Sequence, residues 1–180
     1  MTRCFQIEGG SRNFNFSTRA SHSPLYEVLN LTKGIKRPRD GFFLRAESFF
    51  NVATEIERLG VSGSYGGRSL HELSHGESFL TLVMNRFGGN GLYLLDEPEA
   101  ALSPSRQLAL LSRLHQLVKL NSQFIIATHS PILMAYPDAK IYSLASDSIR
   151  EIEYTDTEHY AVTRQFLNRH ETMLKDLLRG

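Results

Sequence analysis

Residues Leu92 to Glu99 read LYLLDEPE, and this stretch decides the fold of the 180-residue chain. Its four leading apolar residues show no polar alternation, which predicts a strand that is buried on both faces. Asp96 and Glu97 follow at once, so two carboxylates lie side by side at the carboxyl end of this strand. Ligands bind at that edge of an open α/β sheet. The alternative interpretation is a strand followed by a plain acidic turn, and Pro98 supports a turn.

Metal-assisted phosphoryl transfer is the chemistry that needs two adjacent carboxylates at such an edge. One carboxylate holds Mg²⁺, directly or through a water molecule, and the other orients or deprotonates an attacking water. Because short motifs also match by chance, the segments before and after Asp96 and Glu97 have to decide between this interpretation and the acidic turn.

The composition is that of one soluble globular domain, with 41% apolar and 22% charged residues. A net charge of +1 gives no electrostatic argument for an anionic membrane or for nucleic acid, which stays an alternative without support from charge. The single cysteine, Cys4, excludes an internal disulfide and is typical of a reducing compartment. No segment approaches the roughly 18 apolar residues of a membrane span, so we expect a soluble cytoplasmic protein.

Upstream of the quoted stretch, the pattern predicts two helices, a strand and a Gly/Ser-rich loop. The expected bounds are 23–31 for the first helix, 42–46 for the strand, 48–59 for the second helix and 60–69 for the loop. Ser23-Pro24 is a helix start signal, and Gly60 is a stop signal. The loop is either a plain connector or a segment that orders on ligand binding, and the sequence leaves both open.

The segment LHELSHGES, residues 70–78, leads into an apolar helical stretch that ends at about Phe87. Ser74 and Gly76 lie just ahead of this helix, where unpaired backbone N–H groups and the positive end of the helix dipole favour an anion such as a phosphate. The alternative interpretation is a capping serine followed by a glycine turn.

Downstream of the quoted stretch, the pattern predicts a long helix, a second buried strand and further short elements. The expected bounds are 104–120 for the long helix, which Ser103 caps, 123–127 for the buried strand, a short helix capped at Ser130-Pro131, strands at 141–144 and 149–154, and helices at 157–169 and 173–178. The expected buried side chains are Leu108, Leu111, Leu114, Leu117 and Val118 in the long helix, and Tyr160, Ala161, Phe166 and Leu167 in the helix at 157–169.

Two short apolar strands separated by one amphipathic helix predict a right-handed βαβ unit, so we expect residues 92–95 and 123–127 to be neighbouring parallel strands. His129 follows the second of these strands. A lone histidine is usually structural, but at this edge of the sheet it is a candidate contact for a phosphate. We therefore expect Asp96, Glu97 and His129 to converge at one edge.

Taken together, these signals resemble the C-terminal half of an ABC-type P-loop ATPase head over about residues 42–145. The segment 73–77, LSHGE, resembles the LSGGQ signature, and Leu92 to Glu97 resembles Walker B with its catalytic glutamate. Residues 100–103 stand where the D-loop stands, and His129 stands where the switch histidine stands. Ser74 precedes Asp96 by 22 positions, and His129 follows Asp96 by 33, and both spacings are close to those of such heads. DEPEAALSP and ATHSP look most like predicted AAA-family ATPases related to the SMC and DNA-repair heads, rather than transporter subunits.

The resemblance implies a fold, two cofactors and roles for individual residues. The implied fold is α/β, a P-loop NTPase of the ABC-ATPase type with three layers and a mainly parallel sheet. The implied cofactors are ATP and Mg²⁺, and the implied partner is a second head, a homodimer or a complete ATPase head, arranged head to tail. Asp96 would hold Mg²⁺, Glu97 would polarise the attacking water, and His129 would contact the γ-phosphate. The signature residues Ser74, Gly76 and Glu77 would bind the partner's ATP.

The sequence departs from the family pattern in four places. His75 replaces a glycine and Glu77 a glutamine of the signature, while Ser103 replaces the D-loop aspartate, which puts coupling between the two sites in doubt. No residue stands out as the Q-loop glutamine, and Glu47, just after the strand predicted at 42–46, is the nearest polar candidate. No GxxxxGK[ST] motif occurs in the 180 residues, although in this family that loop cradles the phosphates.

The missing motif leads to the expectation of a single truncated ATPase head, residues 1–180, without its N-terminal strand and phosphate loop. In the first of three interpretations, the chain is the C-terminal portion of an ATPase that hydrolyses ATP as a dimer when complete. In the second it is a non-catalytic module that binds a complete head, and in the third it is an inert fragment. We expect the chain by itself to hydrolyse ATP poorly or not at all.

Overall fold

The structure is a computed structural model that describes residues 30, 32, 34–35, 37–60, 70–145 and 147–179. The helix predicted at 23–31 and the loop predicted at 60–69 lie outside the described residues, apart from residues 30 and 60. The chain divides into two compact units, residues 1–128 and 129–180, and each is described by itself. No helix among the described residues is long and apolar enough to cross a membrane.

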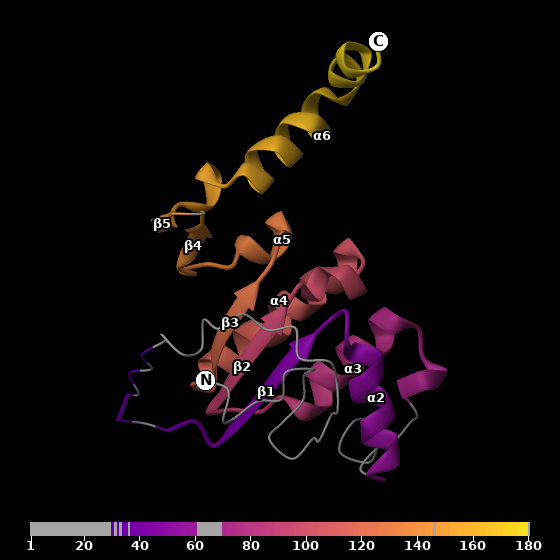
Figure 1. Ribbon diagram of the computed structural model, residues 1–180, viewed down its shortest axis with the longest axis vertical. Coiled ribbons are helices and arrows are strands. Elements are labelled where there is room, and N and C mark those ends of the chain that lie inside the picture. The colour runs from indigo at the N-terminus through magenta and orange to yellow at the C-terminus, as the bar shows by residue number, and fades with distance from the viewer. Residues whose placement is uncertain are drawn as a thin grey trace. The chain divides into compact units, whose positions relative to one another are not determined.

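The first unit alternates strands with helices, as Figure 1 shows. Its elements are β1 (Asp40–Arg45), α2 (Phe49–Arg58), the 3-10 helix η2 (Leu70–Glu72), α3 (His75–Arg86), β2 (Gly91–Asp96), the 3-10 helix η3 (Pro98–Ala101), α4 (Pro104–Lys119) and β3 (Gln123–Ala127). The observed bounds of the strands and long helices lie within about two residues of those expected from the sequence, which is the usual uncertainty of helix ends.

The three strands form one parallel sheet with β2 in the centre (Figure 1). In the register, Leu94 lies between Phe43 of β1 and Ile125 of β3. The prediction that β2 and β3 are neighbouring parallel strands is therefore confirmed. The mixed α/β architecture with a parallel sheet confirms the expected fold class as well.

Helices α2, α3 and α4 form a single layer against the sheet, with α3 in the middle. Phe87 at the end of α3 stacks on Tyr93 of β2 with ring centroids 4.2 Å apart, and it lies 5.7 Å from Phe42 of β1. Phe79 of α3 contacts Phe49 of α2 in the same way, at 5.7 Å. On the other side, Arg113 of α4 donates hydrogen bonds to the backbone oxygens of Met84 and Phe87. Within this unit the described residues thus form two layers, and the third layer stays a prediction.

Burial alternates along the sheet, so the expectation of strands buried on both faces is wrong in part. Tyr93 and Leu95 are buried, whereas their neighbours Leu92 and Leu94 are only half-buried. In β3, Ile125 is 45% exposed. The physical reason is that both βαβ connections advance in the same direction across the sheet, so right-handed crossovers place all three helices on one face.

The buried stripe of α4 is also shifted from the predicted one. Leu110, Leu114 and Leu117 are buried together with Gln107, but Leu108 and Val118 are 59% and 41% exposed. Gln107 donates from Nε2 to the backbone oxygen of Leu102, and this hydrogen bond lets a polar side chain occupy a buried position.

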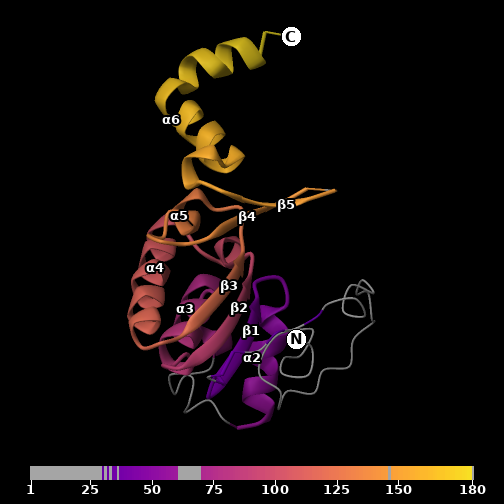
Figure 2. The ribbon, with the colours of Figure 1, turned by 90° about the vertical axis from the view of Figure 1, so that its left-hand side faces the viewer.

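The second unit contains a short helix, a β-hairpin and a long helix. Its elements are α5 (Pro131–Met134), β4 (Ile141–Leu144), β5 (Ile149–Ile152), the 3-10 helix η4 (Tyr154–Asp156) and α6 (Glu158–Leu177). Figure 2 shows β4 and β5 as a narrow two-stranded ribbon, and they pair antiparallel. The two helices expected at 157–169 and 173–178 are observed as two segments of α6, which meet at a kink where Arg169 has a non-helical backbone conformation. No residue of α6 is fully buried. Tyr160 is half-buried, with its ring centroid 4.6 Å from that of Tyr154, whereas the expectation of inward side chains is wrong for Ala161, Phe166 and Leu167, which are exposed.

A polar cluster at the amino end of β1 links β1, α3 and β2. Both guanidinium Nη atoms of Arg86 donate to the carboxylate of Asp40, and the Tyr93 hydroxyl lies 3.3 Å from the same carboxylate. Burial alone would raise the pKa of Asp40. The hydrogen bonds and the charge of Arg86 outweigh that effect, and the net result is a pKa below the ordinary value.

We predict that Asp40→Asn lowers the free energy of unfolding by about 1–3 kcal/mol at neutral pH, because it leaves a half-buried guanidinium without its counter-charge. Since the pKa of Asp40 is lower in the folded state, this stabilisation is present above the unfolded pKa of about 3.9 and is lost as pH falls through the folded pKa. Urea unfolding at several pH values measures both effects. Asp147→Asn in the exposed hairpin turn is the control, and equal losses in the two variants would contradict the prediction.

Candidate functional site

The carboxyl ends of the three strands bring Arg45, Asp96 and Ala127 into one row of the sheet. Backbone hydrogen bonds extend this pairing beyond the strands. The N–H of Ala46 donates to the oxygen of Asp96 at 3.1 Å, and the N–H of Glu97 donates to the oxygen of Ala127 at 2.9 Å. The backbone of the two predicted site residues, Asp96 and Glu97, is thus held in place by both neighbouring strands.

Asp96 forms an ion pair with Arg45, whose Nε lies 3.1 Å from Oδ2, and its side chain is 33% exposed. Arg45 also reaches Glu47 at 3.0 Å, so one guanidinium bridges two carboxylates. Partly exposed ion pairs of this kind contribute little to stability.

The donor set at this edge fits Mg²⁺ that arrives with a nucleotide. Magnesium is usually held by one or two carboxylates together with waters and substrate phosphates. Within the described ranges there is no group of three or more His, Cys, Asp or Glu side chains that could hold a metal by itself. The single, partly exposed carboxylate of Asp96 is compatible with this kind of site.

Glu97 has a left-handed backbone conformation, with φ +47° and ψ +49°, directly before Pro98. For a residue other than glycine this conformation costs on the order of 1 kcal/mol. The side chain is exposed, and the residue caps η3, whose Ala100 N–H donates to the Glu97 oxygen at 3.0 Å. Backbone strain of this kind clusters at active sites, because surrounding contacts have to maintain it.

A hydrogen bond between Thr128 and Glu99 ties the two motif segments together. The Thr128 hydroxyl donates to Glu99 Oε2 at 2.7 Å, which joins η3 to the residue that follows β3. Glu99 and Thr128 were not among the residues predicted from the sequence. The sequence did contain a signal for this contact, because Glu99 in DEPE and Thr128 in ATHS each follow one of two neighbouring strands.

The signature segment forms a capping box at the beginning of α3. Both the backbone N–H and the hydroxyl of Ser74 donate to Glu77 Oε2. The hydrogen bond from the Ser74 hydroxyl lowers the pKa of Glu77 most, and the bond from the Ser74 backbone N–H lowers it next. Together with the charge of Arg106, they hold the pKa of Glu77 below its usual value. This is the arrangement that the alternative interpretation, a capping serine, leads one to expect.

Arg106 is a residue that the sequence reasoning missed. It extends from the first turn of α4, where Nη2 lies 3.1 Å from Glu77 Oε1 and Nη1 lies 3.5 Å from the Ser74 hydroxyl. The signature residues are therefore fixed by a cation as well as by each other. Arg106 stands three positions after the capping Ser103, which places it on the first turn of α4.

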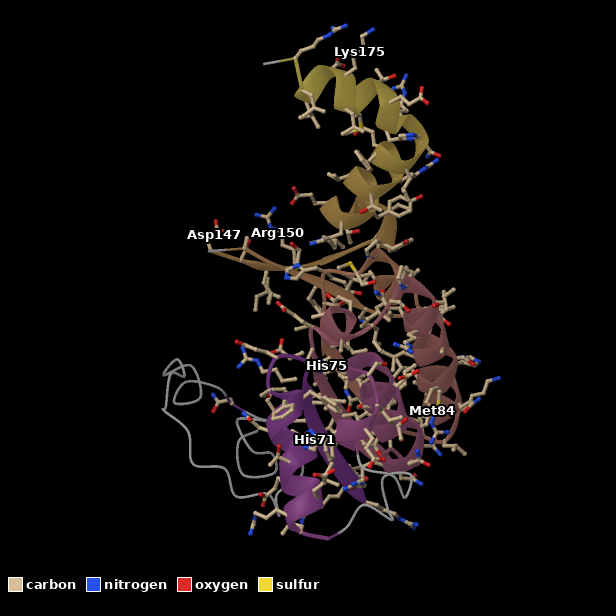
Figure 3. All side chains as sticks on the ribbon, turned by 90° about the vertical axis from the view of Figure 1, so that its right-hand side faces the viewer. His71, His75, Met84, Asp147, Arg150 and Lys175 are labelled. Atoms are coloured by element: carbon tan, nitrogen blue, oxygen red, sulfur yellow. The ribbon has the colours of Figure 1, made fainter. Side chains whose placement is uncertain are left out.

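Gly76 is buried where α3 packs against η3. A Cβ atom at this position would lie 2.6 Å from the backbone oxygen of Ala101 and 2.8 Å from Nη1 of Arg106. Only glycine therefore allows the signature helix to approach the segment that follows Glu97. Figure 3 labels His75 beside this position, at the beginning of α3, where its ring meets Phe49 edge-on at 5.3 Å.

His129 is the first residue of the second unit, whereas Asp96 and Glu97 belong to the first unit. The convergence of these three residues therefore stays a prediction. Within its own unit, His129 Nδ1 lies 3.0 Å from His159 Nε2.

These features define an ABC/AAA-type P-loop ATPase domain. They are a parallel sheet with two adjacent carboxylates at its carboxyl edge, and a signature-like helix that contacts the next segment through a glycine. The chain belongs to the family described as "AAA domain, putative AbiEii toxin, Type IV TA system", whose pattern matches residues 13–135. Over 70 residues it is 36% identical to an "Uncharacterized ABC transporter ATP-binding protein" of Haemophilus influenzae. This match covers 38% of the chain and only 27% of that protein. No solved structure matches the chain.

We predict that Gly76→Ala destabilises the protein by about 1–3 kcal/mol, as overpacking does in a tight contact. Helix propensity alone predicts the opposite sign, a gain of about 1 kcal/mol for Gly→Ala. Chemical denaturation measures the difference. Gly88→Ala is the matched control, since a Cβ there meets nothing within 4 Å. An unchanged or increased stability for Gly76→Ala would show that the contact with Ala101 is looser than described.

Proposed function

We propose that the protein binds Mg²⁺–ATP at the carboxyl edge of the β1–β2–β3 sheet and takes part in ATP hydrolysis within a pair of heads. The observation that carries this proposal is the pair Asp96–Glu97, fixed by backbone hydrogen bonds to both neighbouring strands, with Glu97 in a strained left-handed conformation. Membership of an AAA family supports nucleotide binding in general.

Asp96 and Glu97 have different roles in this proposal. Asp96, which is paired with Arg45 in the structure, would provide the carboxylate for Mg²⁺, and the bound metal would supply charge neutralisation of the phosphates. Glu97, exposed and held apart from the strand by its backbone conformation, orients and polarises the attacking water. His129 donates a hydrogen bond to the γ-phosphate.

The signature residues would face the ATP of a partner head. The Ser74 hydroxyl, which now donates to Glu77, would turn to donate to a phosphate oxygen, while the backbone N–H of Ser74 keeps Glu77 in place. Arg106 offsets the negative charge of Glu77, which would otherwise repel the phosphate. Gly76 contributes by keeping α3 close to η3, and the beginning of α3 favours an anion.

A phosphate loop has to be supplied by a segment outside these 180 residues, since they contain no GxxxxGK[ST] motif. Such a loop provides a nest of backbone N–H groups and a lysine that position the β- and γ-phosphates. Two carboxylates without a metal repel a triphosphate. We therefore propose that the chain alone hydrolyses ATP slowly or not at all, and that it acts in the cytoplasm, for which its single Cys4 is suited.

A second candidate function is a non-catalytic module that binds a complete ATPase head through its signature surface. The observation that favours it is the capping box, in which Ser74 and Glu77 already satisfy each other and Arg106. In that case Asp96 and Glu97 would be dispensable, whereas the surface around Ser74 would be essential.

The test is a Mg²⁺-dependent ATPase assay on the purified chain, and on the same chain joined to any in-frame upstream segment of its gene that encodes a phosphate loop. We expect turnover only in the longer form. Glu97→Gln in that form should lower turnover by about 100-fold or more with ATP binding retained, as loss of a general base does. Glu171→Gln on the exposed face of α6 is the matched control and should leave turnover unchanged.

Two outcomes would contradict the proposal. Turnover by the 180-residue chain equal to that of the longer form would show that no phosphate loop is needed. Retained turnover in Glu97→Gln would show that Glu97 is not the base. Binding to a complete head that survives Glu97→Gln and is abolished by Ser74→Arg would favour the second candidate function.

A further inference from the structure

Two histidines that lie 30 positions apart in the sequence meet ring to ring in the second unit. Nδ1 of His129 lies 3.0 Å from Nε2 of His159, and the ring centroids are 5.1 Å apart. The distance is that of a hydrogen bond between two ring nitrogens. His159 plays no part in the function proposed above.

The backbone that carries His129 is anchored by the next residue. Ser130 is the N-cap of α5 and is only 5% exposed. Its hydroxyl accepts hydrogen bonds from the backbone N–H groups of Ile132 and Leu133 at 3.1 and 3.2 Å. Because the cap is buried and satisfied, the position of His129 relative to α5 is fixed.

The backbone that carries His159 is anchored in the same way. His159 is the second residue of α6, whose N-cap, Thr157, is 4% exposed. The Thr157 hydroxyl accepts from the N–H of Tyr160 at 3.3 Å and donates to the oxygen of Tyr154 at 2.8 Å. Helices α5 and α6 pack against each other. The rings of His129 and His159 therefore lie at the capped N-terminal ends of two neighbouring helices in one unit.

A hydrogen bond between the two nitrogens requires one hydrogen atom, and in two neutral arrangements of the pair either His159 Nε2 or His129 Nδ1 carries it. If His159 Nε2–H donates, His129 Nδ1 is the acceptor and His129 carries its own hydrogen on Nε2. If His129 Nδ1–H donates instead, Nε2 of His129 has only a lone pair. An anionic oxygen is attracted by the first form of His129 and repelled by the second.

We propose that His159 is a positioning residue that donates Nε2–H to Nδ1 of His129, and thereby fixes His129 as a hydrogen-bond donor to phosphate through Nε2. This inference rests on the proposed function, in which His129 contacts the γ-phosphate. The partner of the nitrogen opposite to the ligand sets the tautomer of a functional histidine, and here that partner comes from the first turn of α6.

Nitrogen-15 NMR of the histidine rings in the ligand-free 180-residue chain tests the hydrogen bond without any activity. The two-bond couplings of each ring show which nitrogen carries the hydrogen. The chain has seven histidines, and the single variants His129→Asn and His159→Asn assign the two signals. We expect His129 and His159 both to carry their hydrogen on Nε2.

Two further variants separate hydrogen bonding from packing. His159→Gln retains an N–H donor on a side chain of similar reach, whereas His159→Phe retains a ring without a donor. We expect the Nδ1 resonance of His129 to move to the position of an unbonded nitrogen in His159→Phe and to stay in His159→Gln. Mg²⁺–ATP affinity should fall by about fivefold to tenfold in the phenylalanine variant, the loss expected for one hydrogen bond, and by less than about twofold in the glutamine variant.

The control is His170→Phe, a substitution at an exposed position of the same helix, which should change neither readout. A His129 ring that carries its hydrogen on Nδ1, or a His129 signal unaffected by His159→Phe in a folded variant, would overturn the inference. Absence of ATP binding in the longer form that includes a phosphate loop would count against the proposed function instead, because the NMR result on the ligand-free pair is independent of it.

Discussion

The structure depends on the parallel pairing of β2 with both β1 and β3. This pairing sets the row Arg45–Asp96–Ala127 and continues through backbone hydrogen bonds of Ala46 and Glu97, so the backbone of both carboxylate residues is fixed to the sheet. The close approach of Gly76 to Ala101 then joins the signature helix to the segment that follows Glu97. A change in the strand register by one residue would move Asp96 to the other face of the sheet and remove the site.

The features that the sequence predicted well are those that short-range chemistry determines. Two apolar strands of four to five residues with one amphipathic helix between them leave a parallel βαβ unit as the natural solution, and β2 and β3 pair in this way. The helix starts at Ser103-Pro104 and Ser130-Pro131 followed from capping rules and are observed. The adjacent carboxylates at the end of β2 followed from the order of residues alone.

The features that it did not predict depend on long-range packing. The expected stripe of α4 included Leu108 and Val118, but the neighbours of α4 bury Gln107 and Leu110 instead, and periodicity cannot fix that phase. The apolar residues of α6 gave a helix pattern and no indication that none of them would be buried. Arg106 and His159 escaped notice because their partners, Glu77 and His129, lie 29 and 30 positions away in the sequence.

The central claim is that a metal–nucleotide complex binds at the carboxyl edge of β2. Paramagnetic Mn²⁺ with ATP, added to the isotope-labelled chain, tests it directly, because amide signals near the metal are lost first. The two ends of a six-residue strand are about 16 Å apart, so the edges are easily distinguished. If the nucleotide binds there, the amide signals of Asp96 and Glu97 should be lost while that of Gly91 persists, and the effect should be weaker in Asp96→Asn. Equal loss at both ends, or earlier loss at Gly91, would contradict it.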